Sequence, residues 1–332
     1  MNTSQQVKTN KNHYTEIDIY RGLGIILVVL GHALKQTGET NALFDILISV
    51  IYSFHMPLFF VASGFIAIKI LDLRGKESRL DFIKRRAIRL LIPYFAVGLF
   101  YMPIKFALSK YAVKPYDFSS AWKLLIGENP NTVLWFLYTL FIISTICVLI
   151  LNHKNLRIAL LVSAIISAIA WAADTEIETF KYLVFFILGI YLRKHYDDFN
   201  PALKESPLIA AVTAITFLLT NIMMFATNYS GWTFVTAISG CILFLYIAIK
   251  INSSKGIVNK VANICGSYSM DIYILSDLIA TAVRILVWGI LSFHYIPCTI
   301  ICFMVSMFLP IPISKYIIRK VKPLKLLILG EQ

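Results

Sequence analysis

Arg21 and His32 are the residues of this chain whose types and positions most clearly suggest chemistry. Both lie in the apolar run 17–34, where an ionisable side chain is costly unless it has a function. They are eleven residues apart, which in a helix is about three full turns, so the two side chains share a face. Their separation along the axis is about 16 Å, which places one near each side of a bilayer. The pair predicts a functional site that extends along the helix axis from one side of the bilayer toward the other.

Asp18 lies three residues before Arg21 and is expected to pair with it on the same helix face. The alternative is that both residues anchor the helix at the inner headgroup layer. His32 is expected near the outer end, where a neutral imidazole suits a general base at physiological pH. The alternative for His32 is a hydrogen-bonded packing residue.

A second histidine, His55, stands two residues before Pro57. Pro57 is expected to break the helical hydrogen bonds there, and broken helices at membrane depth line cavities. The following Ser63 and Gly64 leave room for close approach of another backbone. Since this span is expected to enter from the outer side, His55 and His32 could share a pocket. The alternative is a proline kink that the histidine fills.

Three arginines, Arg85, Arg86 and Arg89, cluster at the inner mouth of the third apolar run. Arg85 and Arg89 are i, i+4 neighbours, and two guanidinium groups on one face suit phosphate oxygens. The alternative is a basic segment that contacts anionic lipid.

Asp277 and Arg284 lie two helical turns apart in the ninth apolar run. They are expected to share a face and to pair through an intermediate group or with another helix.

The elements that position these residues are predicted to be membrane helices. The chain of 332 residues is 58% hydrophobic and 15% charged, with a mean hydropathy of +0.74. A soluble domain does not need so much apolar surface. About ten runs are long enough to cross the hydrocarbon core, and the sixth is the shortest. They cover residues 17–34, 54–71, 87–108, 132–151, 157–173, 180–192, 207–226, 231–251, 269–291 and 295–313, and residues 43–53 could add a half-helix before the second.

The net charge of +13 indicates topology rather than nucleic-acid binding. Most lysines and arginines fall on one side of the predicted helices if the N-terminus is inside, as the positive-inside rule requires. The fold class is therefore an all-α polytopic membrane protein with both termini cytoplasmic. It divides into a polar tail (1–16), a membrane domain (17–313) and a basic tail (314–332). The five cysteines show no spacing typical of a metal site and are expected to be packed thiols.

Five strings occur in order along the chain: 17–22 with the spacing from Arg21 to His32, then 54–60, 85–90, 134–137 and 269–273. Together they resemble the membrane acyltransferase family 3, bacterial O-acetyltransferases that act on surface sugars, and most closely its fucose 4-O-acetylase-like branch. The resemblance implies transfer of an acyl group, usually acetyl, from acetyl-CoA to a carbohydrate hydroxyl, with Arg21 and His32 essential. Many relatives carry a histidine where this chain has Ser276, so no role for that histidine carries over.

On this basis the phosphates of acetyl-CoA are expected at Arg85, Arg86 and Arg89, and its pantetheine arm is expected to pass Arg21. His32 would then remove the proton of the acceptor hydroxyl as it attacks the thioester, and an acyl-histidine intermediate is a variant. The oxyanion donor stays open among His55, Tyr138 and Ser63.

The expected partners are acetyl-CoA as a substrate, a carbohydrate or lipid-linked saccharide, and membrane lipids, with no permanently bound cofactor. Five aromatic residues are expected near the outer side, where they could stack on sugar rings or anchor the helices at the membrane–water interface: Tyr101, Tyr111, Tyr116, Trp122 and Trp232. The alternative function is a transporter of a lipid-linked sugar or acyl carrier. Transporters commonly contain two repeated halves, and residues 17–151 and 157–313 show no convincing match.

Overall fold

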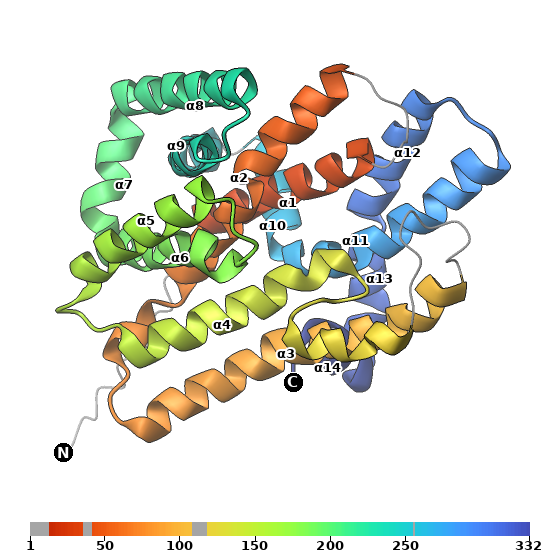
Figure 1. Ribbon diagram of the computed structural model, residues 1–332, viewed down its shortest axis with the longest axis horizontal. Helices are drawn as coiled ribbons and strands as arrows, with labels where there is room; N and C mark the ends of the chain where they lie inside the picture. The colour runs from red at the N-terminus through yellow and green to blue at the C-terminus, as the bar shows by residue number, and fades with distance from the viewer. Residues whose placement is uncertain (1–12, 36–41, 108–117, 255) are drawn as a thin grey trace, which may run out of the picture.

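The computed structural model describes residues 13–35, 42–107, 118–254 and 256–332, and the regular structure in these residues is entirely helical (Figure 1). This confirms the all-α prediction. The α-helices are α1 (Thr15–Lys35), α2 (Ala42–Ile66), α3 (Lys76–Ala107), α4 (Trp135–Ile150), α5 (Leu156–Ala172), α6 (Glu178–Lys194), α7 (Tyr196–Glu205), α8 (Pro207–Thr227), α9 (Trp232–Ser254), α10 (Ile257–Ser267), α11 (Ser269–Arg284), α12 (Tyr295–Phe308), α13 (Pro310–Tyr316) and α14 (Lys322–Leu329). Short 3₁₀ segments are η1 (Ile68–Asp72), η3 (Phe118–Ile126), η4 (Thr132–Leu134) and η6 (Ile318–Lys320), and η5 (Ile285–Ile290) is a π-helix.

Eight helical segments in the described part of the chain are long and apolar enough to cross a membrane. They are Thr15–Lys35, Ala42–Ile66, Lys76–Ala107, Thr132–Ile150, Pro207–Thr227, Trp232–Ser254, Ser269–Ile290 and Tyr295–Lys320. The remaining two predicted spans correspond to α5 and α6, which are shorter at 17 residues each. The count of ten spans therefore stays a prediction.

Helix α2 corrects the prediction of a break at Pro57. It runs without interruption from Ala42 to Ile66, so residues 43–53 belong to the second span rather than to a separate half-helix. Pro57 is buried inside the helix, and α2 packs against α1, α6 and α9. Packing against neighbouring helices holds a proline-containing helix together in a membrane protein, because local adjustments satisfy the backbone groups that proline frees.

Glycines bring two pairs of helices into backbone contact. A Cβ atom at Gly64 of α2 would lie 1.9 Å from the Phe186 carbonyl oxygen, and one at Gly189 of α6 would lie 2.0 Å from that of Val61. The close approach expected at Ser63 and Gly64 is thus present. Helix α1 meets α10 in the same way, since a Cβ at Gly266 would lie 1.7 Å from the Asp18 carbonyl oxygen. This contact fixes the helix that carries Arg21.

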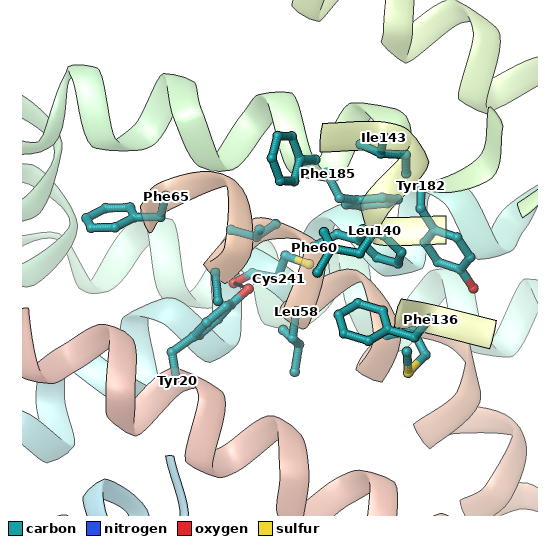
Figure 2. Packing of buried hydrophobic residues seen from close by; sticks show 14 of the residues in the cluster. Tyr20, Leu58, Phe60, Phe65, Phe136, Leu140, Ile143, Tyr182, Phe185 and Cys241 are labelled. Atoms are coloured by element: carbon teal, nitrogen blue, oxygen red, sulfur yellow. Dashed lines mark hydrogen bonds between the residues drawn. The ribbon is translucent and has the colours of Figure 1, made fainter. Parts of the chain in front are cut away.

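An aromatic core joins α2, α4 and α6 (Figure 2). The ring of Phe60 stacks on Tyr182 with centroids 4.7 Å apart and meets Phe136 edge-on at 4.9 Å. On the other side, the Tyr20 hydroxyl donates to the Cys241 carbonyl at 3.3 Å and ties α1 to α9. All five cysteines are buried free thiols, as expected. The core makes α1, α2 and α4 a rigid frame for the residues between them.

The C-terminal residues 314–332, predicted as a basic tail, comprise the end of α13, η6 and α14, and α14 packs against α3 (Figure 1). Gly330 follows α14 with φ +62°, and a Cβ there would lie 2.6 Å from the carbonyl oxygens of Ile88 and Arg89. Glycine is the residue that accepts both the left-handed conformation and this contact. The last residues of the chain are therefore fixed beside the arginines of α3.

Candidate functional site

A cavity of about 280 Å³ opens between α1, α2, α3, α4 and α11, and three arginines line it. These are Arg21, Arg86 and Arg89. Ser63, Ser269 and apolar or aromatic side chains make up the rest of the wall: Met56, Phe59, Ala62, Ile66, Leu90, Phe136, Leu137, Leu140, Met270 and Tyr273. None of the described residues in this lining is a carboxylate. The cavity, called the arginine cavity below, suits an anionic group attached to an apolar chain.

Arg21 is held in place from two helices. Its Nη1 donates to Asp18 Oδ1 at 3.3 Å, which confirms the predicted ion pair, and its Nη2 donates to Ser269 Oγ of α11 at 2.7 Å. Asp18 also lies 2.9 Å from His13 Nε2. Ser269 is a partner that spacing along the sequence did not indicate. Arg21 is thereby fixed where α1 meets α11, at the wall of the arginine cavity.

The arginines of α3 separate into two groups. Arg86 and Arg89, three residues apart, line the arginine cavity, whereas the side chain of Arg85 is exposed and lies outside the lining. The expected pairing of Arg85 with Arg89 on one face toward a ligand is thus replaced by Arg86 with Arg89. The reason is the rotation of α3 about its axis, which is set by its packing on α4 and α14.

Arg89 is also bound to the C-terminal segment. Its Nη1 donates to the Leu329 carbonyl and to Glu331 Oε1, the latter at 2.9 Å. Glu331 Oε2 accepts from Arg319 Nη1 at 3.0 Å, and Arg319 Nη2 lies 3.0 Å from both oxygens of the fully buried Asp271. Sequence reasoning counted Arg319 only as a topology charge and missed Glu331. This charged network, called the C-terminal network below, connects α3, α11 and the last residues.

His32 lies near the opposite end of α1. It is half-buried and lines a second, small cavity of about 10 Å³ together with Ser276, Asp277 and Ser306 of α11 and α12. Its ring packs edge-on against Tyr52 of α2, with centroids 6.0 Å apart. This second cavity is called the histidine cavity below.

His55 is a buried neighbour of the same tyrosine. Its ring centroid is 4.9 Å from that of Tyr52, and its Nδ1 lies 2.8 Å from the Ile51 carbonyl oxygen. A carbonyl can only accept, so Nδ1 carries the proton and Nε2 is the nitrogen left for other partners. His55 lines neither the arginine cavity nor the histidine cavity. The two histidines are thus connected through the Tyr52 ring.

Asp277 pairs with a residue on another helix. This was one of the two predicted alternatives, the other being a link to Arg284 through an intermediate group. Asp277 Oδ2 accepts from the Tyr101 hydroxyl of α3 at 2.9 Å, and Arg284 Nη2 donates to Thr281 Oγ1 at 3.1 Å. Tyr101 is therefore mostly buried rather than displayed to a sugar.

The other candidate side chains have different surroundings. The Tyr138 hydroxyl donates to the Leu125 carbonyl at 3.1 Å, while Ser63 lies on the arginine cavity. Among the remaining aromatic residues considered for sugar stacking, Trp122 is exposed and Trp232 is half-buried, and Tyr111 and Tyr116 lie outside the described residues.

The two cavities follow one another along the seam between α1 and α11. Ser269, Met270 and Tyr273 of α11 face the arginine cavity, and one turn further Ser276 and Asp277 face the histidine cavity. Helix α1 contributes Arg21 to the first and His32 to the second. An extended ligand lying along this seam would contact arginines at one end and an imidazole at the other.

Comparison with known proteins identifies a family for this arrangement. A family model described as an acyltransferase domain, that of acyltransferase family 3, matches residues 14–315. The nodulation protein NolL of Mesorhizobium japonicum is 28% identical over 170 residues, a stretch that covers 49% of this chain and 43% of that protein. The match thus spans less than half the length of this curated relative. No solved structure matches the chain significantly. With the family model covering nearly the whole chain and the helices suited to a bilayer, the chain belongs to acyltransferase family 3, a family of membrane acyltransferases.

Proposed function

We propose that this protein is an O-acetyltransferase of the plasma membrane, with both termini cytoplasmic, that moves an acetyl group from acetyl-CoA to a hydroxyl of a cell-surface or lipid-linked carbohydrate. The observation that carries this proposal is the seam between α1 and α11. Along it lie a cavity lined by three arginines and, about 16 Å further along α1, His32 on a separate small cavity. A donor with phosphates at one end and a thioester at the other has a matching shape and charge.

Arg86 and Arg89 are the proposed contacts for the phosphates of the donor, with Arg21 beside the path of the pantetheine arm. The cavity of about 280 Å³ lies at the lower end of the volumes of small-molecule sites, roughly 300–1,000 Å³. It suits the arm and one phosphate group, so the nucleotide of the coenzyme would lie at the mouth of the cavity. There the exposed Arg85 adds positive charge without a direct role in the lining.

His32 is the proposed general base. It takes the proton from the acceptor hydroxyl while the hydroxyl oxygen forms a bond to the carbonyl carbon of the thioester. The carbon–sulfur bond then breaks, and the leaving thiolate of coenzyme A takes up the proton from His32, so atoms and charges balance. An acyl-histidine intermediate is the variant in which His32 itself attacks first. Ser63, which lines the arginine cavity, is the proposed donor to the oxyanion. His55 is not suited to this role in its present tautomer, because its proton is on Nδ1, next to the Ile51 carbonyl, and Nε2 can only accept.

The proposed function can be tested with purified protein in lipid nanodiscs. Acetyl-CoA and an envelope glycan fraction should give free thiol and an acetylated product, which mass spectrometry detects as one added acetyl group. Glycans from cells with and without the gene should differ by the same group, which would also name the acceptor. A transporter would instead carry labelled lipid-linked sugar into proteoliposomes without consuming thioester, and that result would contradict the proposal.

Arg86→Ala combined with Arg89→Ala is expected to raise the KM for acetyl-CoA by roughly 10- to 100-fold, with a smaller change in kcat. Hydrogen bonds to charged groups contribute about 1.5–3 kcal/mol, and about 1.4 kcal/mol corresponds to a tenfold change. The measurement is the initial rate of thiol release at increasing acetyl-CoA concentration. Arg85→Ala is the matched control and should leave KM within about threefold, because exposed charges contribute little. An unchanged KM in the double variant would remove the phosphate role.

A further inference from the structure

We infer that Asp277 is a positioning residue for His32, which orients the imidazole and stabilises its protonated form across the histidine cavity. The inference rests on the proposed function and adds to it a residue outside the strings that carry the family resemblance. It begins from the lining of the histidine cavity, in which His32 of α1 and Asp277 of α11 face the same small space.

The histidine cavity is about the size of one water molecule, and its lining combines four polar side chains with Val29, Ala33, Ala280 and Cys302. Its volume of about 10 Å³ is close to the minimum that holds one water, and such a water needs two to four polar partners. His32, Asp277, Ser276 and Ser306 supply them. Ser306 is 1% exposed, and its Oγ has no hydrogen-bond partner among the described residues. A water at this point would connect His32 to Asp277 and satisfy the Ser306 hydroxyl.

The charges around His32 favour Asp277 for this role. The charged groups that act on the imidazole are Asp277, Lys35 and Arg284, and of these only Asp277 is negative. Lys35 and Arg284 disfavour a second positive charge nearby. A general base that gains a proton during the reaction becomes an imidazolium, which an adjacent carboxylate stabilises.

Tyr101 holds Asp277 in the required orientation. Its hydroxyl donates to Asp277 Oδ2 at 2.9 Å from α3, which leaves Oδ1 for the histidine cavity. A half-buried carboxylate bound from one side in this way has less freedom to turn than one in solvent. Tyr101 is therefore a second positioning residue, one step further from His32.

Asp277→Asn is expected to lower kcat for acetyl transfer about 10- to 100-fold and to leave the KM for acetyl-CoA within about twofold. The amide keeps the volume of the side chain and removes its charge. Asp277→Glu should recover a measurable part of kcat, whereas Asp197→Asn, which removes an exposed carboxylate on α7, should leave both constants unchanged. Initial rates of thiol release in nanodiscs give both constants.

The outcomes separate the inference from the proposed function. Wild-type kcat in Asp277→Asn, in a preparation where His32→Ala is inactive, would overturn the positioning role and leave the proposed function standing. An inactive wild-type protein would instead overturn the proposed function. If Asp277→Asn does not fold, or if its KM rises by as much as its kcat falls, the residue has a structural role. Tyr101→Phe, which keeps the ring, then decides: a kcat at least threefold lower with KM unchanged supports the inference, and an unchanged kcat overturns it.

Discussion

Replacement of His32 with alanine is expected to lower kcat for acetyl transfer by roughly 10²- to 10⁴-fold, the usual contribution of a general base. The binding of acetyl-CoA should change little, because His32 lies outside the arginine cavity, with its ring against Tyr52. The measurement is single-turnover transfer from labelled acetyl-CoA, together with equilibrium binding of coenzyme A to the same preparation. Loss of turnover with retained binding is the expected pair of results.

His294→Ala is the matched control for this experiment. His294 precedes α12 on an exposed stretch, and its ring contacts only Tyr295 among the described aromatic residues. This variant should transfer acetyl at the wild-type rate. Transfer at the wild-type rate by His32→Ala as well would rule out His32 as the base, whatever the other variants show.

Replacement of Gly266 with valine is expected to prevent α1 from docking on α10 and to cost at least about 3 kcal/mol, the upper part of the usual range for overpacking. A Cβ at this position would lie 1.7 Å from the Asp18 carbonyl oxygen, and backbone atoms cannot rotate away as a side chain does. Because Asp18 holds Arg21, the same displacement would dismantle the arginine cavity. The measurements are the yield of monodisperse protein in detergent and its thermal unfolding midpoint.

Gly256→Ala is the control, at the N-cap of the same helix. Gly256 precedes α10 at φ −82°, and a Cβ there would meet only Ser254 Oγ, at 4.0 Å. Alanine is a poorer N-cap than glycine, so this substitution should cost about 1 kcal/mol at most and lower the unfolding midpoint by only about 2–4 °C. A Gly266→Val protein with the wild-type midpoint would show that the helices do not meet as described.

The features that the sequence predicted correctly are local. The membrane helices follow from the length of each apolar run, and the Asp18–Arg21 pair follows from a spacing of three residues within one helix. The order of five motifs along the chain predicted the family, and the family match over residues 14–315 confirms that family. Neither kind of reasoning requires knowledge of how one helix lies against another.

The features that sequence reasoning missed depend on helix packing. Arg21 meets Ser269 across 248 residues, and Arg89 meets Glu331 across 242, so no spacing rule connects them. The choice of Arg86 over Arg85 depends on the rotation of α3. The continuity of α2 through Pro57 shows packing against neighbouring helices overriding a local preference. Periodicity determines which residues share a helix, whereas the partners on other helices follow only from the assembled bundle.

The C-terminal network has a consequence for the biosynthesis of this protein. Arg89 is made early, whereas the groups that hold it, the Leu329 carbonyl and Glu331, are made 240 and 242 residues later. Asp271 of α11 likewise has no ion-pair partner from this network until Arg319 has been made. A nascent chain can therefore insert α1 to α9 into the bilayer with the arginine cavity still incomplete. The bonds that hold Arg89 therefore form only after residues 329–331 have been made, so a chain that stops before them would lack this support of the arginine cavity.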